Sequence, residues 1–309
     1  MSEKSDLRGK TIVITGASSG LGRGAAEKLA GEGANVVIAA RRGRVLDELA
    51  EQIRAAGGVA LAVEADVSEP DDIARLAAAA LDRFGRIDVW INNVGIGALG
   101  AFWEVPIEDH ARVIDVNLKG LLYGAHAALR QFRAQGEGIL VNVGSVESEV
   151  PLVYQSSYAA SKAAVLSLSR GLNEELRLTG EQHTIKVGTI MPWAVDTPWW
   201  THAANYTGQA PRMAPMDDPA ATIDAIVQAC TSPKEEHRIG VKAHIADISH
   251  RLFPHLTERL SAKTADAESQ KGSPVPPTTG AIHAPIDEGT TVEGGVRERM
   301  RREDAARRE

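Results

Sequence analysis

Tyr158 and Lys162 stand four residues apart in the segment Tyr-Ala-Ala-Ser-Lys. On a helix, positions i and i+4 share one face, so the phenol and the ammonium can reach the same small volume. A nearby cation favours the phenolate and brings the pKa of a tyrosine down from its ordinary value of about 10. Such a pair can donate a proton to a carbonyl oxygen while a hydride reaches the carbon. The spacing therefore indicates an oxidoreductase site.

A glycine-rich loop follows the first apolar run of the sequence. Gly16, Gly20 and Gly22 come after the β-branched segment Thr11 to Thr15 and open a helical pattern from Leu21 to Glu32. Glycines permit a tight turn and let backbone N–H groups approach a pyrophosphate at the positive end of a helix. Glycine-rich turns alone are a weak signal, but the strand, turn and helix around this one favour a dinucleotide site.

The end of the next apolar run bears on the choice of dinucleotide. Ala40 is followed there by Arg41 and Arg42. An acidic residue at this point would bind the ribose hydroxyls of NAD, whereas a guanidinium suits the 2′-phosphate of NADP. The pattern favours NADP(H) over NAD(H). The alternative is that the two arginines only solvate the start of a helix.

Strand-like and helix-like segments alternate along most of the chain. The strand candidates after Thr11 to Thr15 are Val36 to Ala40, Val59 to Val63, Val89 to Ile91, Ile139 to Val143 and Ile185 to Ile190. Longer helical segments separate them, such as Asp71 to Phe84 and Ser157 to Leu178. Strands that are apolar on both faces and alternate with helices indicate a parallel sheet covered on both sides. We expect a doubly wound, Rossmann-like α/β domain that binds ligands at the carboxyl ends of its strands.

Composition divides the chain into two parts. With 309 residues, 43% of them hydrophobic, the chain can bury a sizeable core. We expect one catalytic dinucleotide-binding domain over residues 1–262. Residues 263–309 are rich in Pro and Gly and then in charges, which predicts a mobile or loosely docked tail. The alternative is that this extension docks over a neighbouring active site as a lid.

Charge and cysteine content exclude several classes of function. The net charge of -7 gives no general attraction to nucleic acid or to anionic membranes. The polar amino-terminal segment and the lack of a long apolar run predict a cytoplasmic protein without membrane insertion. Cys230 is the only cysteine, and the nine histidines form no metal-binding motif, so we expect no disulfide and no metal.

Five motifs in this order resemble the short-chain dehydrogenase/reductase family over about Leu7 to Val241. Thr15 to Gly22 resembles its Thr-Gly-x-x-x-Gly-x-Gly loop, and Asp66-Val67 resembles its adenine contact. Asn92-Asn93-Val94-Gly95 resembles its Asn-Asn-Ala-Gly, with valine in place of alanine. The remaining two motifs are the catalytic residues and the Pro192 segment described next.

By this resemblance, four residues form the catalytic set: Asn117, Ser145, Tyr158 and Lys162. Tyr158 would donate or accept the substrate proton, and Lys162 would lower its pKa and bind the nicotinamide ribose. Ser145 would hold the substrate oxygen. Asn117, at a local helix distortion, would fix a water that passes protons to Lys162. Taken singly, each of these residues could instead end a strand, cap a helix or pack a helix interface.

The resemblance also implies which residues contact the cofactor. Besides Tyr158 and Lys162, they are Gly16, Ser18, Ser19, Gly20, Leu21, Gly22, Arg41, Arg42, Asp66, Val67, Asn93, Gly95, Pro192, Val195 and Thr197. Thr197 would reach the nicotinamide carboxamide. Trp193 stands where the family has a glycine after Pro192, so we expect a large ring to reshape the nicotinamide pocket or to limit substrate size.

Aromatic and apolar residues follow several of the expected strands. We expect Trp103, Leu152, Trp193, Trp199 and Trp200 to line a pocket for an apolar small molecule, although the same residues could make a subunit contact.

The sequence thus predicts an NADP(H)-dependent carbonyl reductase or alcohol dehydrogenase. The alternatives are a non-catalytic dinucleotide-sensing or scaffold protein, and an epimerase or dehydratase on the same fold that holds a nicotinamide without net consumption. By resemblance, we expect a homodimer or homotetramer.

Overall fold

The computed structural model describes residues 7–307 of the chain. A parallel seven-stranded sheet organises these residues, with the strand order β3-β2-β1-β4-β6-β7-β9. Its strands are β1 (Thr11–Thr15), β2 (Asn35–Ala40), β3 (Val59–Glu64), β4 (Val89–Asn92), β6 (Gly138–Val143), β7 (Ile185–Met191) and β9 (Glu236–Arg238). The doubly wound, Rossmann-like prediction is confirmed.

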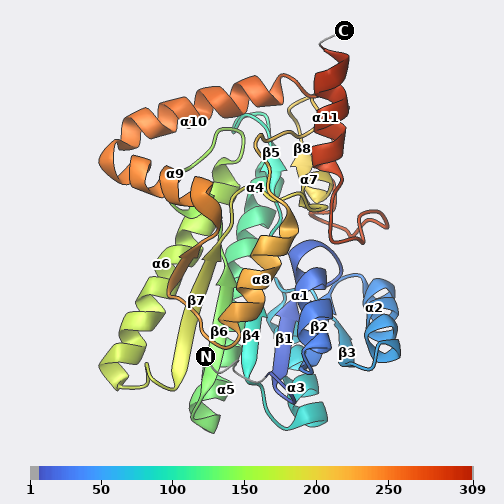
Figure 1. The fold of residues 1–309 in the computed structure, drawn as a ribbon, viewed down its shortest axis with the longest axis vertical. Helices are drawn as coiled ribbons and strands as arrows, with labels where there is room; N and C mark the ends of the chain where they lie inside the picture. Colours follow the sequence, from blue (N-terminus) through green and yellow to red (C-terminus); the bar gives the residue numbers. More distant parts are fainter. Residues whose placement is uncertain (1–6, 308–309) are drawn as a thin grey trace.

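Helices cover both faces of the sheet (Figure 1). One face carries α1 (Gly20–Gly31), α2 (Gly43–Ala55) and α8 (Pro219–Ala229), whose apolar side chains form one core with the strands. The other face carries α3 (Pro70–Phe84), α5 (Gly120–Gln135) and α6 (Ser156–Thr179), which form a second core. Because strand residues alternate between the two covered faces, the inner strands β1, β2, β4, β6 and β7 are largely apolar.

Local sequence signals account for the bounds of several helices. In α3, Pro70 occupies the first turn, where its missing N–H costs nothing, and Asp71 and Asp72 complement the positive end of the helix. Gly85 follows α3 with φ 76°, a left-handed conformation that other residues rarely adopt. Such signals explain why helix bounds on this part of the chain agree with the sequence pattern.

Shorter elements surround the carboxyl end of the sheet. They are β5 (Ala98–Leu99), α4 (Ile107–Ile114), the π-helical turn η1 (Asp115–Lys119), the 3₁₀ turn η2 (Val146–Ser148), α7 (Trp199–His202) and β8 (Ala204–Asn205). β5 and β8 pair as a separate two-stranded sheet. These elements bring the segments after β4, β6 and β7 together.

The carboxyl-terminal part adds α9 (Gly240–Leu252), α10 (Pro254–Ser269) and α11 (Val296–Ala306). The expected domain boundary at residues 262 and 263 falls inside α10. Figure 1 places α10 and α11 beyond the carboxyl end of the sheet. In place of the loosely docked tail that the composition predicts, the structure has Val296 and Met300 packed in one cluster with Trp200 and Met213.

A buried cation accounts for much of this docking. Arg212 is only 4% exposed, and its guanidinium pairs with Glu303 and, at 2.7 Å, with Asp304. Glu303 and Asp304 of α11 therefore neutralise the buried charge of Arg212. The amino-acid composition of the tail cannot reveal such a pairing.

Candidate active site

α6 and the end of β6 bring the catalytic residues together. Lys162 lies one turn after Tyr158, and its Nζ lies 5.7 Å from the centre of the phenol ring. Nζ also donates a 2.8 Å hydrogen bond to the Val143 carbonyl at the end of β6. Ser145 follows β6, and its hydroxyl makes a hydrogen bond that favours the phenolate of Tyr158. Tyr158, Lys162 and Ser145 thus share one wall of the site.

Burial dominates the electrostatics of this pair. It lowers the pKa of Lys162 to about 8, while Glu147 opposes the shift. Burial also raises the pKa of Tyr158 above its ordinary value, and Glu147 adds to that rise more than the Ser145 hydrogen bond lowers it. The direction for Tyr158 is therefore opposite to the lowered pKa that the four-residue spacing predicts.

Asn117 lies in η1, where the helix between α4 and α5 takes a π-helical turn. Its side chain accepts a 2.8 Å hydrogen bond from the Ile96 amide, and donates to the Ile96 carbonyl at 2.9 Å and to the Ser161 hydroxyl at 3.0 Å. The side chain is fully buried and joins the segment after β4 to α6. The local helix distortion expected at this residue is present.

The glycine loop lies between β1 and α1. Gly16 has φ 72°, and a Cβ on Gly22 would lie 2.4 Å from the Gly16 carbonyl oxygen, so neither position accepts a side chain without rearrangement. Asn93 donates to the carbonyls of Thr15 and Gly16 at 3.1 and 3.2 Å, which fixes the loop against the segment after β4. The loop is thereby preshaped for a close ligand.

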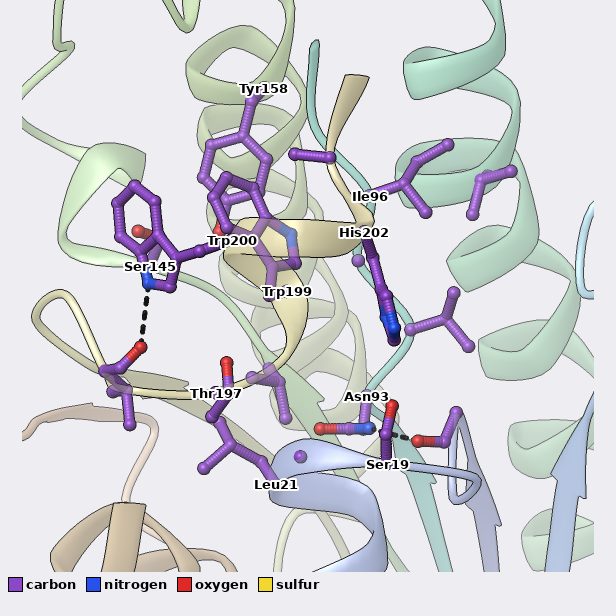
Figure 2. Close-up of a pocket in the computed structure, with 18 of the residues that line it drawn as sticks. Ser19, Leu21, Asn93, Ile96, Ser145, Tyr158, Thr197, Trp199, Trp200 and His202 are labelled. Atoms are coloured by element: carbon purple, nitrogen blue, oxygen red, sulfur yellow. Dashed lines mark hydrogen bonds between the residues drawn. The ribbon is translucent and has the colours of Figure 1, made fainter. Parts of the chain in front are cut away.

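One cavity joins the glycine loop to the catalytic wall. Figure 2 shows Leu21, Thr197 and Ser19 at the loop, and Tyr158, Trp199 and Trp200 further along the pocket. The cavity is lined by nearly all of the expected residues: Gly16, Ser18, Ser19, Gly20, Leu21, Arg41, Arg42, Asp66, Val67, Asn93, Gly95, Ser145, Leu152, Tyr158, Lys162, Pro192, Trp193, Val195, Thr197, Trp199 and Trp200.

Three expected residues lie elsewhere. Trp103 is 84% exposed and does not line the cavity, because the turn before α4 carries it outward. Gly22 and Asn117 lie behind the cavity wall, where they shape the loop and the helix rather than line the space.

The tail crosses the edge of the cavity as a strap, which we define as residues 281–291. Arg41 donates to the backbone carbonyls of Ala281, Ile282 and His283, the last two at 3.3 and 2.9 Å. The Gly20 amide of the glycine loop donates to the Thr291 carbonyl at 2.9 Å. Carbonyls of the strap therefore engage donors on both the second strand and the glycine loop.

Arg42 holds the strap and the glycine loop together. Its guanidinium donates to the Glu288 carbonyl at 3.0 Å and to the Ser18 hydroxyl at 3.0 and 3.1 Å. Burial lowers the pKa of both Arg41 and Arg42, and Arg41 further lowers that of Arg42. Neutral carbonyl dipoles thus serve as partners for two neighbouring cations.

Sequence reasoning missed several residues of the cavity wall: Glu147, Gln155, His202, Met213, Ala281, Pro285 and Ile286. The position of Glu147 two residues after Ser145, and of Gln155 three residues before Tyr158, was the available signal for these two. Nothing in the sequence pattern indicated that the distant segment 281–286 reaches the site.

Glu147 is the only residue with a carboxylate side chain among these seven residues of the cavity wall. Its side chain is 7% exposed, and burial raises its pKa to about 8, although the Leu152 amide and Lys162 favour the charged form. Its backbone amide donates to the Ser145 hydroxyl at 3.1 Å.

Two further findings concern the described residues. Within residues 7–307, none of the helices combines the length and the apolar character needed to cross a bilayer. Over the same range, His, Cys, Asp and Glu side chains form no group of three or more suited to a metal ion.

Comparison with known proteins agrees with this geometry. Residues 10–206 match the family model for short chain dehydrogenase. An uncharacterized oxidoreductase, YxnA, of Bacillus subtilis (strain 168) is 38% identical over 260 residues, covering 83% of this chain and 72% of its own length. A 3beta-hydroxysteroid dehydrogenase 1 of Eggerthella lenta is 40% identical over 195 residues, covering 62% of this chain and 73% of its own.

Solved structures of the same kind superpose on the chain. A short chain dehydrogenase/reductase from Burkholderia phymatum in complex with NAD has a TM-score of 0.70 and 25% identity, covering 88% of this chain and 99% of its own. A metagenomic short-chain oxidoreductase in complex with NADP has a TM-score of 0.64 and 30% identity, covering 77% and 100%. The protein therefore belongs to the short-chain dehydrogenase family of oxidoreductases that bind a nicotinamide cofactor.

Proposed function

We propose that this protein interconverts a carbonyl and an alcohol on a small, largely apolar molecule with NADP(H). The observation that carries the proposal is the wall on which Ser145, Tyr158 and Lys162 meet, inside a cavity that continues to the glycine loop. When bound, the nicotinamide supplies or accepts the hydride.

Tyr158 holds the proton that the substrate oxygen gains or loses. The Ser145 hydroxyl contacts the same oxygen and keeps it within reach of the phenol. Lys162, beneath the phenol ring, stabilises the phenolate when its ammonium is charged. Asn117 anchors Ile96 and Ser161 on either side of the site, and we assign it to the relay that returns the proton from solvent to Lys162.

The residues of the loop fit a dinucleotide. The close packing of Gly22 on Gly16 keeps side chains away from the first turn of α1, where a pyrophosphate would compete with the Thr291 carbonyl for the Gly20 amide. Asp66 and Val67 line the cavity where an adenine would lie. Val195 and Thr197 line the nicotinamide end. One solved relative is a complex with NAD and another is a complex with NADP, so the relatives leave the choice between the two cofactors open.

The preference for NADP(H) rests on Arg41 and Arg42. Ala40 provides no carboxylate to repel a 2′-phosphate. Among residues 7–307, the two guanidiniums donate their hydrogen bonds to backbone carbonyls and to Ser18 rather than to carboxylates. A phosphate dianion is a stronger partner for two adjacent guanidiniums than neutral carbonyls are. The 2′-phosphate of NADP(H) would therefore displace some of the strap carbonyls from Arg41 and Arg42.

The catalytic end of the cavity favours an apolar substrate body. Leu152, Trp193, Trp199, Trp200 and Met213 line it, and the Trp199 ring lies 5.1 Å from the Tyr158 ring. The name of the Eggerthella lenta relative describes a hydroxysteroid dehydrogenase, which acts on an apolar alcohol. We also propose a homodimer or homotetramer that pairs through α5 and α6.

A panel of ketones, aldehydes and alcohols, followed by nicotinamide absorbance with NADPH and NADH and their oxidised forms, tests this function. Turnover that disappears in Tyr158→Phe supports it. Tight cofactor binding without turnover across the panel would favour the dinucleotide-sensing alternative. Conversion of a substrate without net change in nicotinamide absorbance would favour an epimerase or dehydratase.

A further inference from the structure

Three buried polar atoms of the cavity wall have no hydrogen-bond partner among the described residues. One is the indole nitrogen Nε1 of Trp199, and the other two are acceptor oxygens, Oε2 of Glu147 and Oε1 of Gln155. The Glu147 and Gln155 side chains are 7% and 4% exposed, and both line the cavity that holds Ser145 and Tyr158. A buried polar group without a partner is costly, by about 1 to 3 kcal/mol in mutational data. Their position indicates that a bound molecule supplies the missing partner.

The sequence places both residues beside the reacting groups. Glu147 is in η2, two residues after Ser145, and the hydrogen bond from its amide to the Ser145 hydroxyl ties the two together. Gln155 directly precedes α6, three residues before Tyr158. A group that bonds to these oxygens is therefore carried by a substrate whose carbonyl is held at Ser145 and Tyr158.

We infer that Glu147 and Gln155 form a hydroxyl-binding subsite, so that the substrate is a ketone or alcohol that carries a second hydroxyl near its reacting carbon. This inference rests on the proposed function and specifies its substrate class. The second hydroxyl donates to Glu147 or Gln155, while the apolar body lies against the tryptophans of the cavity.

A hydroxyl fits this position better than a protonated amine. Lys162 already places a cation within electrostatic reach of Glu147, and burial disfavours every charge in the cavity. A hydroxyl can also bond to a carboxyl group in either protonation state, because it both donates and accepts. An amine would depend on the ionised carboxylate alone.

Binding to the protein loaded with NADP⁺ tests the inference, because an oxidised cofactor cannot reduce the carbonyl of the probes. Constant nicotinamide absorbance during the titration checks that the second hydroxyl is not oxidised. The probes are acetophenone, 2-hydroxyacetophenone and 3-hydroxypropiophenone, which place a hydroxyl on the first or second carbon from the carbonyl. We expect the better hydroxyketone to bind at least about tenfold more tightly than acetophenone by calorimetry. Equal affinities of all three would overturn the inference.

The variants separate the subsite from general structure. Glu147→Leu and Gln155→Leu should each reduce the ratio of hydroxyketone affinity to acetophenone affinity severalfold, and Glu147→Gln, which keeps an acceptor oxygen, should restore part of that ratio. Glu149→Gln is the matched control, because Glu149 pairs with Arg238 at 2.6 Å and does not line the cavity. A preference that survives both leucine variants would also reject the subsite.

Two further arms remove ambiguity. Stronger binding of 2-aminoacetophenone, which carries the amine on the carbon next to the carbonyl, than of 2-hydroxyacetophenone would show that the subsite binds a cation. That result would overturn the assignment to a hydroxyl. If neither cofactor binds, the proposed function fails, and the same ketones are then titrated on the cofactor-free protein, where their ranking still decides the subsite. A failure of the proposed function can thus be distinguished from a failure of the hydroxyl-binding subsite.

Discussion

The Arg41 guanidinium donates a 2.9 Å hydrogen bond to the backbone carbonyl of His283, 242 residues further along the chain. Arg41 follows the strand whose end contacts the adenosine ribose in dinucleotide folds. If NADP(H) binds as we propose, the strap and the 2′-phosphate would share this donor. Tight binding would then require the strap to move or to give up part of its bonds to Arg41.

Arg41→Ala tests the cofactor preference. We expect the wild type to bind NADPH more tightly than NADH and the variant to lose about tenfold in NADPH affinity, because one guanidinium to phosphate contact disappears. Calorimetry measures both affinities. Arg44→Ala is the control, since Arg44 is largely exposed and pairs with Glu48. An unchanged ratio of affinities in Arg41→Ala would reject the NADP(H) assignment.

Tyr158→Phe should lower kcat by at least about 10² while leaving the cofactor Kd nearly unchanged, because only the acidic hydroxyl is lost. Steady-state kinetics on any substrate that the wild type turns over provide the measurement. Tyr154→Phe is the matched control: its hydroxyl donates to Asp266 at 2.6 Å, on α10. Substantial residual turnover in Tyr158→Phe would remove its acid-base role.

Trp193→Gly should admit bulkier carbonyls. The Trp193 indole lines the cavity and donates a 2.8 Å hydrogen bond to the Pro215 carbonyl, which fixes the ring in place of the family glycine. We expect relative kcat/KM across a size-graded panel of ketones to shift toward the larger members. Trp103→Ala, which alters an exposed ring, should leave the ranking unchanged. Identical rankings for Trp193→Gly and wild type would contradict size control.

Glu147 should give the protein a pH-dependent stability. Its folded pKa is raised to about 8 from 4.5, so the folded state binds the proton more tightly than the unfolded state does. The stabilisation is complete below about 4.5 and is lost as the pH rises through 8. Glu147→Gln should therefore gain stability relative to wild type between pH 5 and pH 8 in urea unfolding. A constant difference over that range would contradict the raised pKa.

Glu303→Gln tests the docking of α11. The side chain is 11% exposed and pairs with the fully buried Arg212 guanidinium, so its loss should cost about 1 to 3 kcal/mol of unfolding free energy. Its pKa is lowered, by Arg212 and Ser273, so this contribution is present above pH 4.5 and is lost as the pH falls through the folded pKa. Glu298→Gln, on the exposed side of α11, should change the melting temperature little.

Local patterns predict most of the fold and of the catalytic wall. The glycine loop and the four-residue spacing of Tyr158 and Lys162 depend on neighbours in the sequence, and the structure places them as those neighbours imply. The edge strand β9 is polar and only three residues long, so it carries no apolar run that could be recognised. Trp103 looks like a pocket residue by type and position, but the direction of its turn decides its exposure.

The tail shows why the rest could not be predicted. The strap engages Arg41 and Arg42 through its own backbone carbonyls, which are the same in every sequence. Glu303 of α11 pairs with Arg212, which lies 91 residues earlier in the chain. The pKa of Tyr158 is a second case, because burial depends on the whole cavity and opposes the effect of the neighbouring cation. Long-range pairing and desolvation are properties of the folded molecule.

The strap also has a consequence for biosynthesis. Residues 281–291 come after every strand of the sheet in the chain, so a ribosome delivers them once the glycine loop and the catalytic helix have already emerged. During that interval the donors of Arg41, Arg42 and Gly20 face solvent. A nascent chain that captures the dinucleotide then would enclose it when the strap arrives, and the order of translation would become the order of assembly.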